Sequence, residues 1–471
     1  MSATAAVRSD QTAEETSRSR RHFGNLLSGN LLNKGLRFVA AAVLARALTL
    51  DEFGVFNVGI AISGVLVVAT SLGLPEIGTR EVAVSPGQAS DTAGRVVGGR
   101  LIAFLPVAII TCAIGSLAWP GHLEIFAAAM LMGLPMAAAA DWLARGMEQM
   151  RVVGYSVAVG GAVTAIGSGA LYFVGASATS ALLVFGFAEL VAASICWIAV
   201  RSSARPRIKL SGLSSMLRQS WPIALSSIAI YSYLANIDTI IMAGTRSTAE
   251  AGLYSGAYRL FLAFNMIPLF AAYAAFPIIS RAAHEGRLAE ARVTLSENRK
   301  DLLCFALVTI AIIELLGEQM LGLMFGAPFR AVAPTLVLLS AAVGWYSIGY
   351  PDGYSLVAED RSRGFLAGAI TASVLSLALD LLLIPSMGPP GAGLATTIAF
   401  LAAAAVWMLW RGRPDRSTVI VILLVAAASA GALLIGLASW SNTLIGSVTL
   451  AIALVGCVMR ISQHRARRRK R

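Results

Sequence analysis

The sequence has little charge and few residues of the kinds that carry out chemistry. Charged residues make up 13% of its 471 residues, whereas hydrophobic residues make up 57%. Soluble domains typically carry about 25% charged residues, so this composition excludes an ordinary soluble enzyme and a disordered chain. The four histidines fall in predicted tails or loops, and no P-loop, G-x-S-x-G or HExxH motif occurs. We therefore expect neither an enzyme nor a cofactor.

Cysteine is equally scarce. The four cysteines all lie inside apolar runs and none has a CxxC partner, which predicts neither a disulfide framework nor a metal site. Basic residues outnumber acidic ones by 37 to 25, which gives a formal charge of +12. In a soluble protein this excess would suggest a nucleic-acid partner. In a membrane protein, basic residues gather in the cytoplasmic loops instead, so we expect no nucleic acid.

Long apolar runs are what the sequence does contain. Runs of about 20 apolar residues are long enough to cross a bilayer as a helix. They alternate here with short polar segments and predict an all-α polytopic membrane protein with fourteen transmembrane helices. The predicted spans are 24–48, 54–79, 101–118, 123–144, 152–174, 179–200, 221–244, 253–279, 301–323, 333–357, 364–385, 391–410, 418–438 and 442–460.

The basic residues predict the orientation of these helices. If the N-terminus is inside, 31 of the 37 Lys and Arg residues fall in cytoplasmic segments. The opposite side holds only Arg46, Arg246 and Arg330, and three more cations lie within spans. Such a bias follows the positive-inside rule, so both termini are predicted to be cytoplasmic.

Two short similarities indicate an internal repeat. Residues 49–56 (TLDEFGVF) resemble residues 247–254 (STAEAGLY), and Trp197 recurs as Trp407 between similarly spaced arginines. The matches predict two parallel six-helix lobes, an arrangement typical of alternating-access transporters. The predicted organisation is a cytoplasmic tail (1–22), an N-lobe (23–200), a linker that favours an interfacial amphipathic helix (201–220), a C-lobe (221–410), two further helices (411–460) and a basic tail (461–471).

Charged residues inside the spans are candidates for function, because a charge at bilayer depth is costly. Lys34 lies near the midplane of the first span, and Arg37 follows on the same helical face. Two cations on one face predict that both point to water, to an acid or to a substrate anion. Arg259 and Asp238 lie at the same predicted depth on consecutive helices. They are predicted to form an ion pair, either a structural lock or a switch in which Arg259 exchanges Asp238 for a substrate anion.

Other intramembrane acids that we single out fall into two groups. Glu76 with Arg80, and Asp141 with Arg145, have i,i+4 spacing and predict structural ion pairs. Glu189, Asp352 and Asp380 have no partner nearby in the sequence. Unpaired carboxyl groups in a membrane suit ion coupling. Glu189 and Asp352, with Asp238, are therefore the candidates for coupling or gating.

One span combines aromatic residues with a proline. Residues 344–354 contain Trp345, Tyr346 and Tyr350 beside Pro351, which is expected to kink the helix. Aromatic faces and hydroxyl groups at a broken turn suit contacts with sugars. The alternative is a packing kink with tyrosines at the membrane interface.

Several motifs resemble one family of membrane proteins. Residues 44–54 (LARALTLDEFG) look like the "lAr.Lgp..yG" opening of the polysaccharide flippases, which belong to the multidrug/oligosaccharidyl-lipid/polysaccharide exporter superfamily. Residues 236–238, 251–260 and 277–280 resemble helices 7 and 8 of that family. The resemblance covers most of residues 23–410 and implies two six-helix lobes around a cationic lumen. It implies that Lys34 and Arg259 occupy lumen positions where the related lipid II flippases carry arginines.

The resemblance implies a flippase for undecaprenyl-diphosphate-linked oligosaccharides in the bacterial inner membrane, serving lipopolysaccharide or exopolysaccharide assembly by alternating access. Lys34, Arg37 and Arg259 would bind the diphosphate or an acidic sugar, and a proton or cation gradient would act through an acid. The expected partners are membrane lipids, a polysaccharide polymerase and glycosyltransferases. One alternative is a multidrug exporter, whose lumen would favour acids. Another is a glycan ligase or polymerase, which should carry a large outward loop, and none is predicted here.

Overall fold

The computed structural model is helical, which confirms the all-α membrane fold. It describes residues 24, 28–119, 121–205, 211–221, 224, 237–412, 416–438, 446, 449–450 and 453. Within these ranges, ten helices are long and apolar enough to cross a membrane. Most of the predicted spans 221–244 and 442–460, and both tails, lie outside the described residues. The chain separates into two compact units, residues 1–231 and 232–471, which we treat one at a time.

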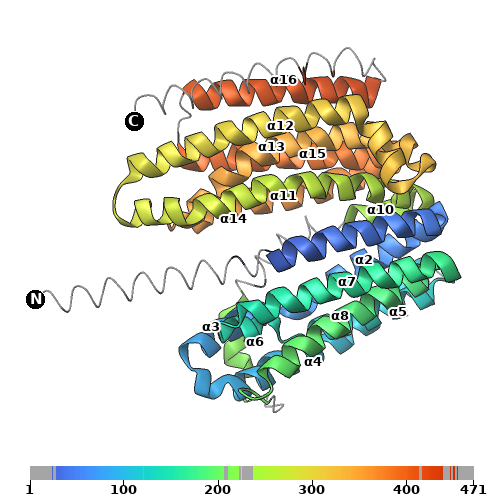
Figure 1. Cartoon of the computed structure of the whole chain (residues 1–471), viewed down its shortest axis with the longest axis vertical. Coiled ribbons are helices and arrows are strands. Elements are labelled where there is room, and N and C mark those ends of the chain that lie inside the picture. The colour runs from blue at the N-terminus through green and yellow to red at the C-terminus, as the bar shows by residue number, and fades with distance from the viewer. Residues whose placement is uncertain are drawn as a thin grey trace, which may run out of the picture. The chain divides into compact units, whose positions relative to one another are not determined.

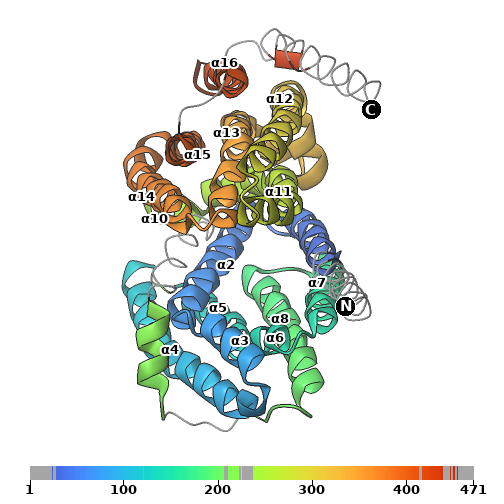
Figure 2. The ribbon, with the colours of Figure 1, turned by 90° about the vertical axis from the view of Figure 1, so that its left-hand side faces the viewer.

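The first unit is a bundle of membrane helices joined by short turns (Figure 2). It begins with a helix over residues 28–47. The elements that follow are α2 (Leu50–Ser71), α3 (Leu74–Val84), the 3-10 helix η1 (Pro86–Gln88), α4 (Ala89–Ala118), α5 (Leu123–Ala137), α6 (Asp141–Gly146), α7 (Met150–Val174) and α8 (Ala178–Val200). Helix α5 packs between α2 and α8.

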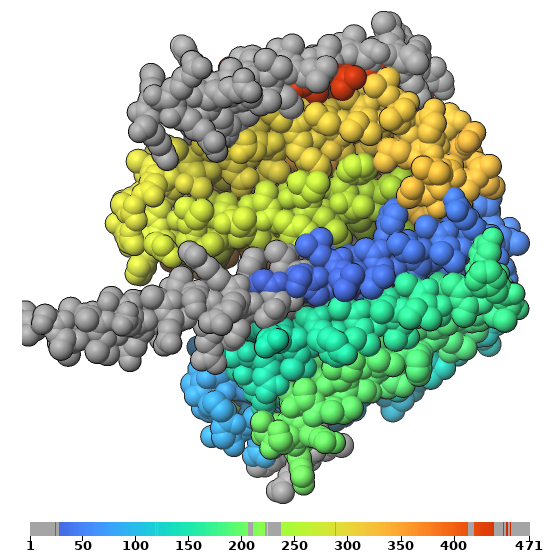
Figure 3. All heavy atoms as spheres, viewed as in Figure 1, coloured from blue at the N-terminus to red at the C-terminus, as the bar shows by residue number. Residues whose placement is uncertain are grey.

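The second unit is built around one almost fully buried helix, α13, which packs against α11, α12 and α15. Its elements are α10 (Ile237–Thr245), α11 (Thr248–His284), α12 (Leu288–Phe325), the 3-10 helix η2 (Ala327–Val332), α13 (Ala333–Ala358), α14 (Ser362–Met387), α15 (Pro389–Arg411) and α16 (Arg416–Ala438). Helices α11 and α12 form a long hairpin (Figure 1) that makes one face of this unit (Figure 3).

Two of the predicted spans are interrupted. The span 54–79 divides into α2 and α3 because Leu72 and Gly73 both take left-handed backbone angles, with φ of 51° and 67°. The span 123–144 divides into α5 and α6 at residues 138–140, just after Pro135. The prediction of continuous helices was therefore wrong at both places. At Pro351 the helix is not interrupted, and α13 continues through the proline from Ala333 to Ala358.

Corresponding turns of the two units have the same local structure. Thr49 caps α2 by accepting a hydrogen bond from the amide of Glu52, and Ser247 caps α11 by accepting one from Glu250. The turn before α7 and the turn before α14 each hold one non-glycine residue at positive φ, namely Glu148 and Asp360. These likenesses support the predicted repeat at the level of single residues.

Part of the linker predicted to be an interfacial helix is described. Residues 213–221 are helical, whereas 206–210 lie outside the described residues. Leu213, Met216 and Leu217 pack against the hydrophobic cluster formed by α3, α4 and α6. The apolar side of this short helix therefore covers the first unit.

Candidate functional site

The two predicted lumen cations of the first unit have different environments. The Arg37 guanidinium forms an ion pair with Glu189 of α8, its Nε donates to Asn33 Oδ1 at 3.1 Å, and its Cζ lies 5.5 Å from the centre of the Phe185 ring. Glu189 has no partner nearby in the sequence, but the fold brings Arg37 to it, so the expectation of an unpaired carboxyl group was wrong. Lys34, one turn earlier, is exposed on the unit's surface and makes no ion pair with a described residue.

The ion pair between Arg37 and Glu189 gives a prediction about stability. Both side chains are partly buried, with 25% and 17% of their surfaces exposed. Replacing either one with leucine should lower the melting temperature, because the other charge loses its partner. The double variant Arg37→Leu with Glu189→Leu should lose less than the sum, with a coupling free energy of about 0.5–3 kcal/mol. Thermal unfolding of the four purified proteins measures this, and strictly additive losses would show that the two charges do not interact.

In the second unit, the predicted pairing of Asp238 with Arg259 is replaced by a different contact. The Asp238 carboxylate accepts hydrogen bonds from the Tyr254 hydroxyl and, at 2.8 Å, from the amide of Thr239. No ion pair with Arg259 occurs within residues 237–284, which are all described. Tyr254 and Arg259 are five residues apart on α11, so they point about 140° apart around the helix axis. The depth estimate found the right helix but not the face of it that meets Asp238.

Asp238 instead belongs to a small acidic cluster. Helix α10 packs against α14, and this contact brings Asp238 close enough to Asp380 for the two carboxyl groups to interact electrostatically. Both residues are buried, with 7% and 4% exposed. Asp380 Oδ2 accepts a hydrogen bond from the Ser376 hydroxyl at 3.2 Å, whereas its Oδ1 is buried without a partner among the described atoms. Two acids that share a pocket with tyrosine hydroxyls can bind a proton or a small cation.

Asp352 lies at the centre of a network that joins three helices. Its Oδ1 accepts a hydrogen bond from Arg299 of α12 at 2.7 Å and lies 3.5 Å from Nε of Arg411, the last residue of α15. Arg411 also donates to Glu359 at 3.0 Å and to the Ser355 hydroxyl. Asp352 is fully buried. Asp352 has no partner nearby in the sequence, but the fold brings two arginines from distant parts of the chain to its single negative charge, so it is not an unpaired carboxyl group.

The aromatic residues of α13 form a ladder on one face. The rings of Tyr346 and Tyr350 are stacked with centres 4.7 Å apart, and Tyr350 and Tyr354 are stacked at 5.7 Å. The three tyrosines are partly exposed, whereas Trp345 is 6% exposed and lies within the packed core. The structure therefore leaves Tyr346 and Tyr350 available for contacts and makes Trp345 a packing residue.

The two predicted i,i+4 ion pairs have opposite outcomes. Asp141 and Arg145 form the expected pair at 2.6 Å. Glu76 and Arg80 are both exposed and do not pair within the described part of α3. Glu76 lies in the first turn of that helix, where a carboxylate is already favoured by the helix dipole.

A buried intramembrane acid is absent from the sequence-based candidates. Glu314 lies in the second half of α12 and is 1% exposed, with the Thr449 side chain beside its carboxyl group. Its sequence signal was an acid in the middle of the predicted span 301–323. The described residues contain no group of three or more His, Cys, Asp or Glu side chains placed to hold a metal ion.

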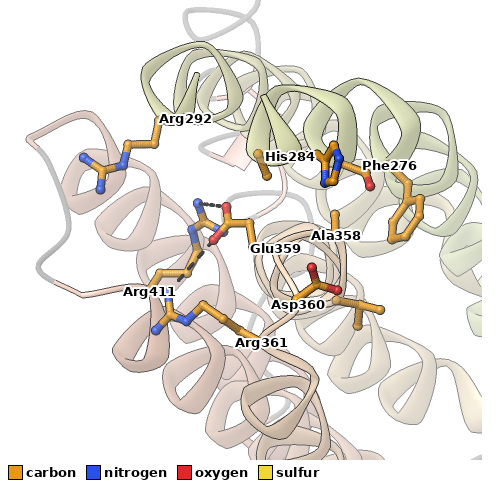
Figure 4. Close-up of a pocket in the computed structure, with 11 residues that line it drawn as sticks. Phe276, His284, Arg292, Ala358, Glu359, Asp360, Arg361 and Arg411 are labelled. Carbon is orange, nitrogen blue, oxygen red and sulfur yellow. Dashed lines mark hydrogen bonds and ion pairs between the residues drawn. The ribbon is translucent and has the colours of Figure 1, made fainter. Parts of the chain in front are cut away.

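A pocket of about 500 Å³ opens where α11, α13 and α15 end and α12 begins. Figure 4 shows Phe276 and His284 of α11 with Arg292 of α12 along one side of it. Arg411 lies opposite and is joined to Glu359 by the dashed contacts in Figure 4. This end of the unit is the one predicted to face the cytoplasm.

Comparison with known proteins gives a consistent result. The sequence profile of the family described as "Polysaccharide biosynthesis protein" matches residues 19–283. The chain is 21% identical over 392 residues to a probable low-salt glycan biosynthesis flippase, Agl15, of Haloferax volcanii, and the match covers 80% of this chain and 79% of that protein.

Solved structures show the same fold. The chain is similar to the lipid II flippase MurJ in its inward closed conformation, with a TM-score of 0.68, 14% identity, and coverage of 93% of this chain and 98% of that structure. It is also similar to an inward-facing multidrug resistance MATE transporter, with a TM-score of 0.60, 14% identity, and coverage of 86% and 99%. The resemblance stated from the sequence motifs is confirmed.

Proposed function

Because the chain belongs to the polysaccharide biosynthesis protein family, we propose that it flips undecaprenyl-diphosphate-linked oligosaccharides across the bacterial inner membrane for the assembly of cell-surface polysaccharide. It is a multi-pass membrane protein with the fold of the flippases and exporters of this superfamily. One observation carries the proposal furthest. Lys34 is an exposed cation on a predicted membrane-spanning helix, where a positive charge without a counter-ion is costly unless a substrate anion meets it.

In this proposal the basic residues have different roles. Lys34 and Arg259 of α11 are each proposed to bind substrate phosphate, and Arg37 is held by Glu189. A lysine ammonium binds phosphate as a point charge, whereas arginine can form two parallel hydrogen bonds. Tyr346 and Tyr350 offer ring faces and hydroxyl groups to the sugars.

The acids supply coupling and gating. Asp238, together with Asp380, is the site at which a proton or cation gradient acts, because these two buried carboxyl groups have hydrogen-bond partners but no described basic partner. Asp352 holds α12, α13 and α15 together through its two arginines, so it acts as a structural part of a gate. The proposal further includes two parallel six-helix lobes, both termini in the cytoplasm, and transport by alternating access. The polymerase and the glycosyltransferases of the same pathway would use and supply the substrate.

The test is flipping by the purified full-length protein in proteoliposomes that contain a fluorescent undecaprenyl-diphosphate disaccharide. Lys34→Ala should lower the initial rate about tenfold, which corresponds to about 1.4 kcal/mol. Lys34→Arg should keep the rate, since charge and phosphate binding are both retained. Arg246→Ala, which removes an exposed arginine paired with Glu250 at a helix start, is the control and should flip normally. Wild-type protein that moves no lipid-linked sugar but exports cationic dyes would favour the multidrug exporter instead.

A further inference from the structure

We propose that the pocket of Figure 4 binds a sugar carrying one carboxylate, so that the transported oligosaccharide contains an acidic residue; this rests on the proposed flippase function. A cavity of about 500 Å³ lies within the size range of small-molecule sites, about 300–1,000 Å³. Its lining comes from four different helices, so it is a built part of the second unit.

The charge of the lining selects a ligand with a single negative charge. Three arginines and two acids line the pocket, which gives a formal charge of +1 with His284 neutral: Arg292, Arg361 and Arg411 against Glu359 and Asp360. Behind Arg411, the pair of Arg299 and Asp352 is neutral as a unit. A monoanion such as a sugar carboxylate would balance the pocket. A diphosphate would bring at least two charges beside the two acids already there, and its excess charge would be unfavourable.

One of the three arginines remains free to meet that carboxylate. Arg411 is held by Asp352 and Glu359, and Arg361 donates to the backbone oxygen of Trp410. Arg292 is exposed on the first turns of α12 and makes no ion pair with a described residue. It lies at the rim of the pocket, and in Figure 4 its guanidinium is turned away from Glu359 and Arg411. An arginine offers a planar pair of donors that fits a carboxylate.

The other walls suit the rest of a sugar ring. Phe276 gives a flat apolar face, and Asp360 with Ser280 provides acceptors and a donor for ring hydroxyl groups. Phe276 also packs on Tyr354, with ring centres 4.9 Å apart. Tyr354 is the end of the tyrosine ladder of α13, so the pocket and the ladder form one aromatic path within the second unit.

Binding of two soluble probes to the full-length protein in detergent tests the proposal. One probe is a disaccharide of glucuronic acid and N-acetylglucosamine, which carries a single carboxylate, and the other is the same disaccharide with its carboxyl group reduced to an alcohol. The acidic probe should bind about tenfold more tightly, a difference of about 1.4 kcal/mol. Arg292→Gln should remove this preference, and Arg292→Lys should keep most of it. Arg287→Gln is the matched control, because Arg287 lies five residues earlier, at the N-cap of α12, and pairs with Glu285 and Glu290.

The aromatic wall has its own test. Phe276→Leu should weaken the binding of both probes about fivefold, whereas Phe276→Tyr should weaken neither, because only leucine removes the flat face. Equal affinity of the wild type for the two probes, or an unchanged preference in Arg292→Gln, would overturn the acidic-sugar site. If the protein still flips undecaprenyl-diphosphate disaccharides in that case, the proposed function stands without this inference. If it flips neither acidic nor neutral lipid-linked sugars, the proposed function itself fails.

Discussion

Replacing Asp352 with alanine is expected to reduce folded protein in the membrane to a small fraction of the wild-type amount. Asp352 is fully buried, and its carboxylate contacts Arg299 at 2.7 Å and Arg411 at 3.5 Å. Removing one member of a buried ion pair leaves the other charge uncompensated, at a cost of about 3–5 kcal/mol. That is a large part of the stability of a typical protein domain, about 5–15 kcal/mol. Size-exclusion chromatography of detergent-extracted fluorescent fusions measures the yield.

Two further variants make this result interpretable. Asp352→Leu combined with Arg299→Met should recover much of the yield, because Arg411 still has Glu359 at 3.0 Å. Asp141→Ala should leave the yield unchanged, since Asp141 pairs with Arg145 while 37% and 42% of the two side chains are exposed. Exposed pairs contribute about 0–1 kcal/mol. Wild-type yield from Asp352→Ala would mean that the two arginines find another counter-charge, and the network would lose its structural role.

Asp238→Asn is expected to bring transport down to background, at least about a hundredfold below wild type or 2.7 kcal/mol, without loss of protein. Asparagine has the same shape: its side-chain oxygen can keep accepting from the Thr239 amide, while its NH2 group takes the place of Oδ2 and can donate to the Tyr254 hydroxyl oxygen. It cannot take up a proton or carry a negative charge, so a driving ion has no effect on it. The measurement is the rate of flipping in proteoliposomes under an imposed proton or sodium gradient.

Variants of the neighbouring residues distinguish a role in ion coupling from a role in packing. Tyr254→Phe removes one hydrogen bond, a net loss of about 0.5–1.5 kcal/mol, so transport should fall only a few-fold. Asp380→Asn should resemble Asp238→Asn, because the two buried carboxyl groups interact electrostatically and are proposed to share the ion. Transport by Asp238→Asn at the wild-type rate, under a gradient that drives the wild type, would show that this cluster takes no part in coupling.

The sequence predicted the helices better than their interruptions. Apolar runs of about 20 residues are a strong signal because the lipid requires them. The interruption at Leu72 and Gly73 gives no such signal, since apolar composition continues across it into α3. Positive φ at a leucine depends on the surrounding fold and not on the residue itself. Residues 138–140 are three alanines, and hydropathy alone therefore predicts that the helix continues through them.

The candidate site was predicted as a set of residues but not as a set of contacts. Arg37 and Glu189 were both identified, yet 152 residues separate them and only the packing of α8 on the first helix joins them. Arg299 and Arg411 were counted as cytoplasmic loop charges, because one predicted span began at 301 and another ended at 410. In the structure, α12 includes Arg299 and α15 includes Arg411. A predicted helix boundary can be moved by a few residues with little change in the mean hydropathy of the span. Such a shift decides whether an arginine lies in water or beside Asp352.

The length of the hairpin formed by α11 and α12 has a practical consequence for measuring conformational changes of the second unit. The two helices contain 37 and 38 residues. At 1.5 Å per residue each is about 55 Å long, whereas the bilayer with its headgroups is about 40–45 Å thick. The turn at residues 285–287 therefore stands about 10 Å clear of the lipid when the outer ends lie at the opposite surface. A rigid rod of this length magnifies small tilts, since a rotation of about 10° about its outer end moves the tip by about 10 Å. A spin label or fluorophore attached at Glu285, which is exposed in this turn, would convert a subtle rearrangement of the second unit into a displacement that distance spectroscopy can read directly.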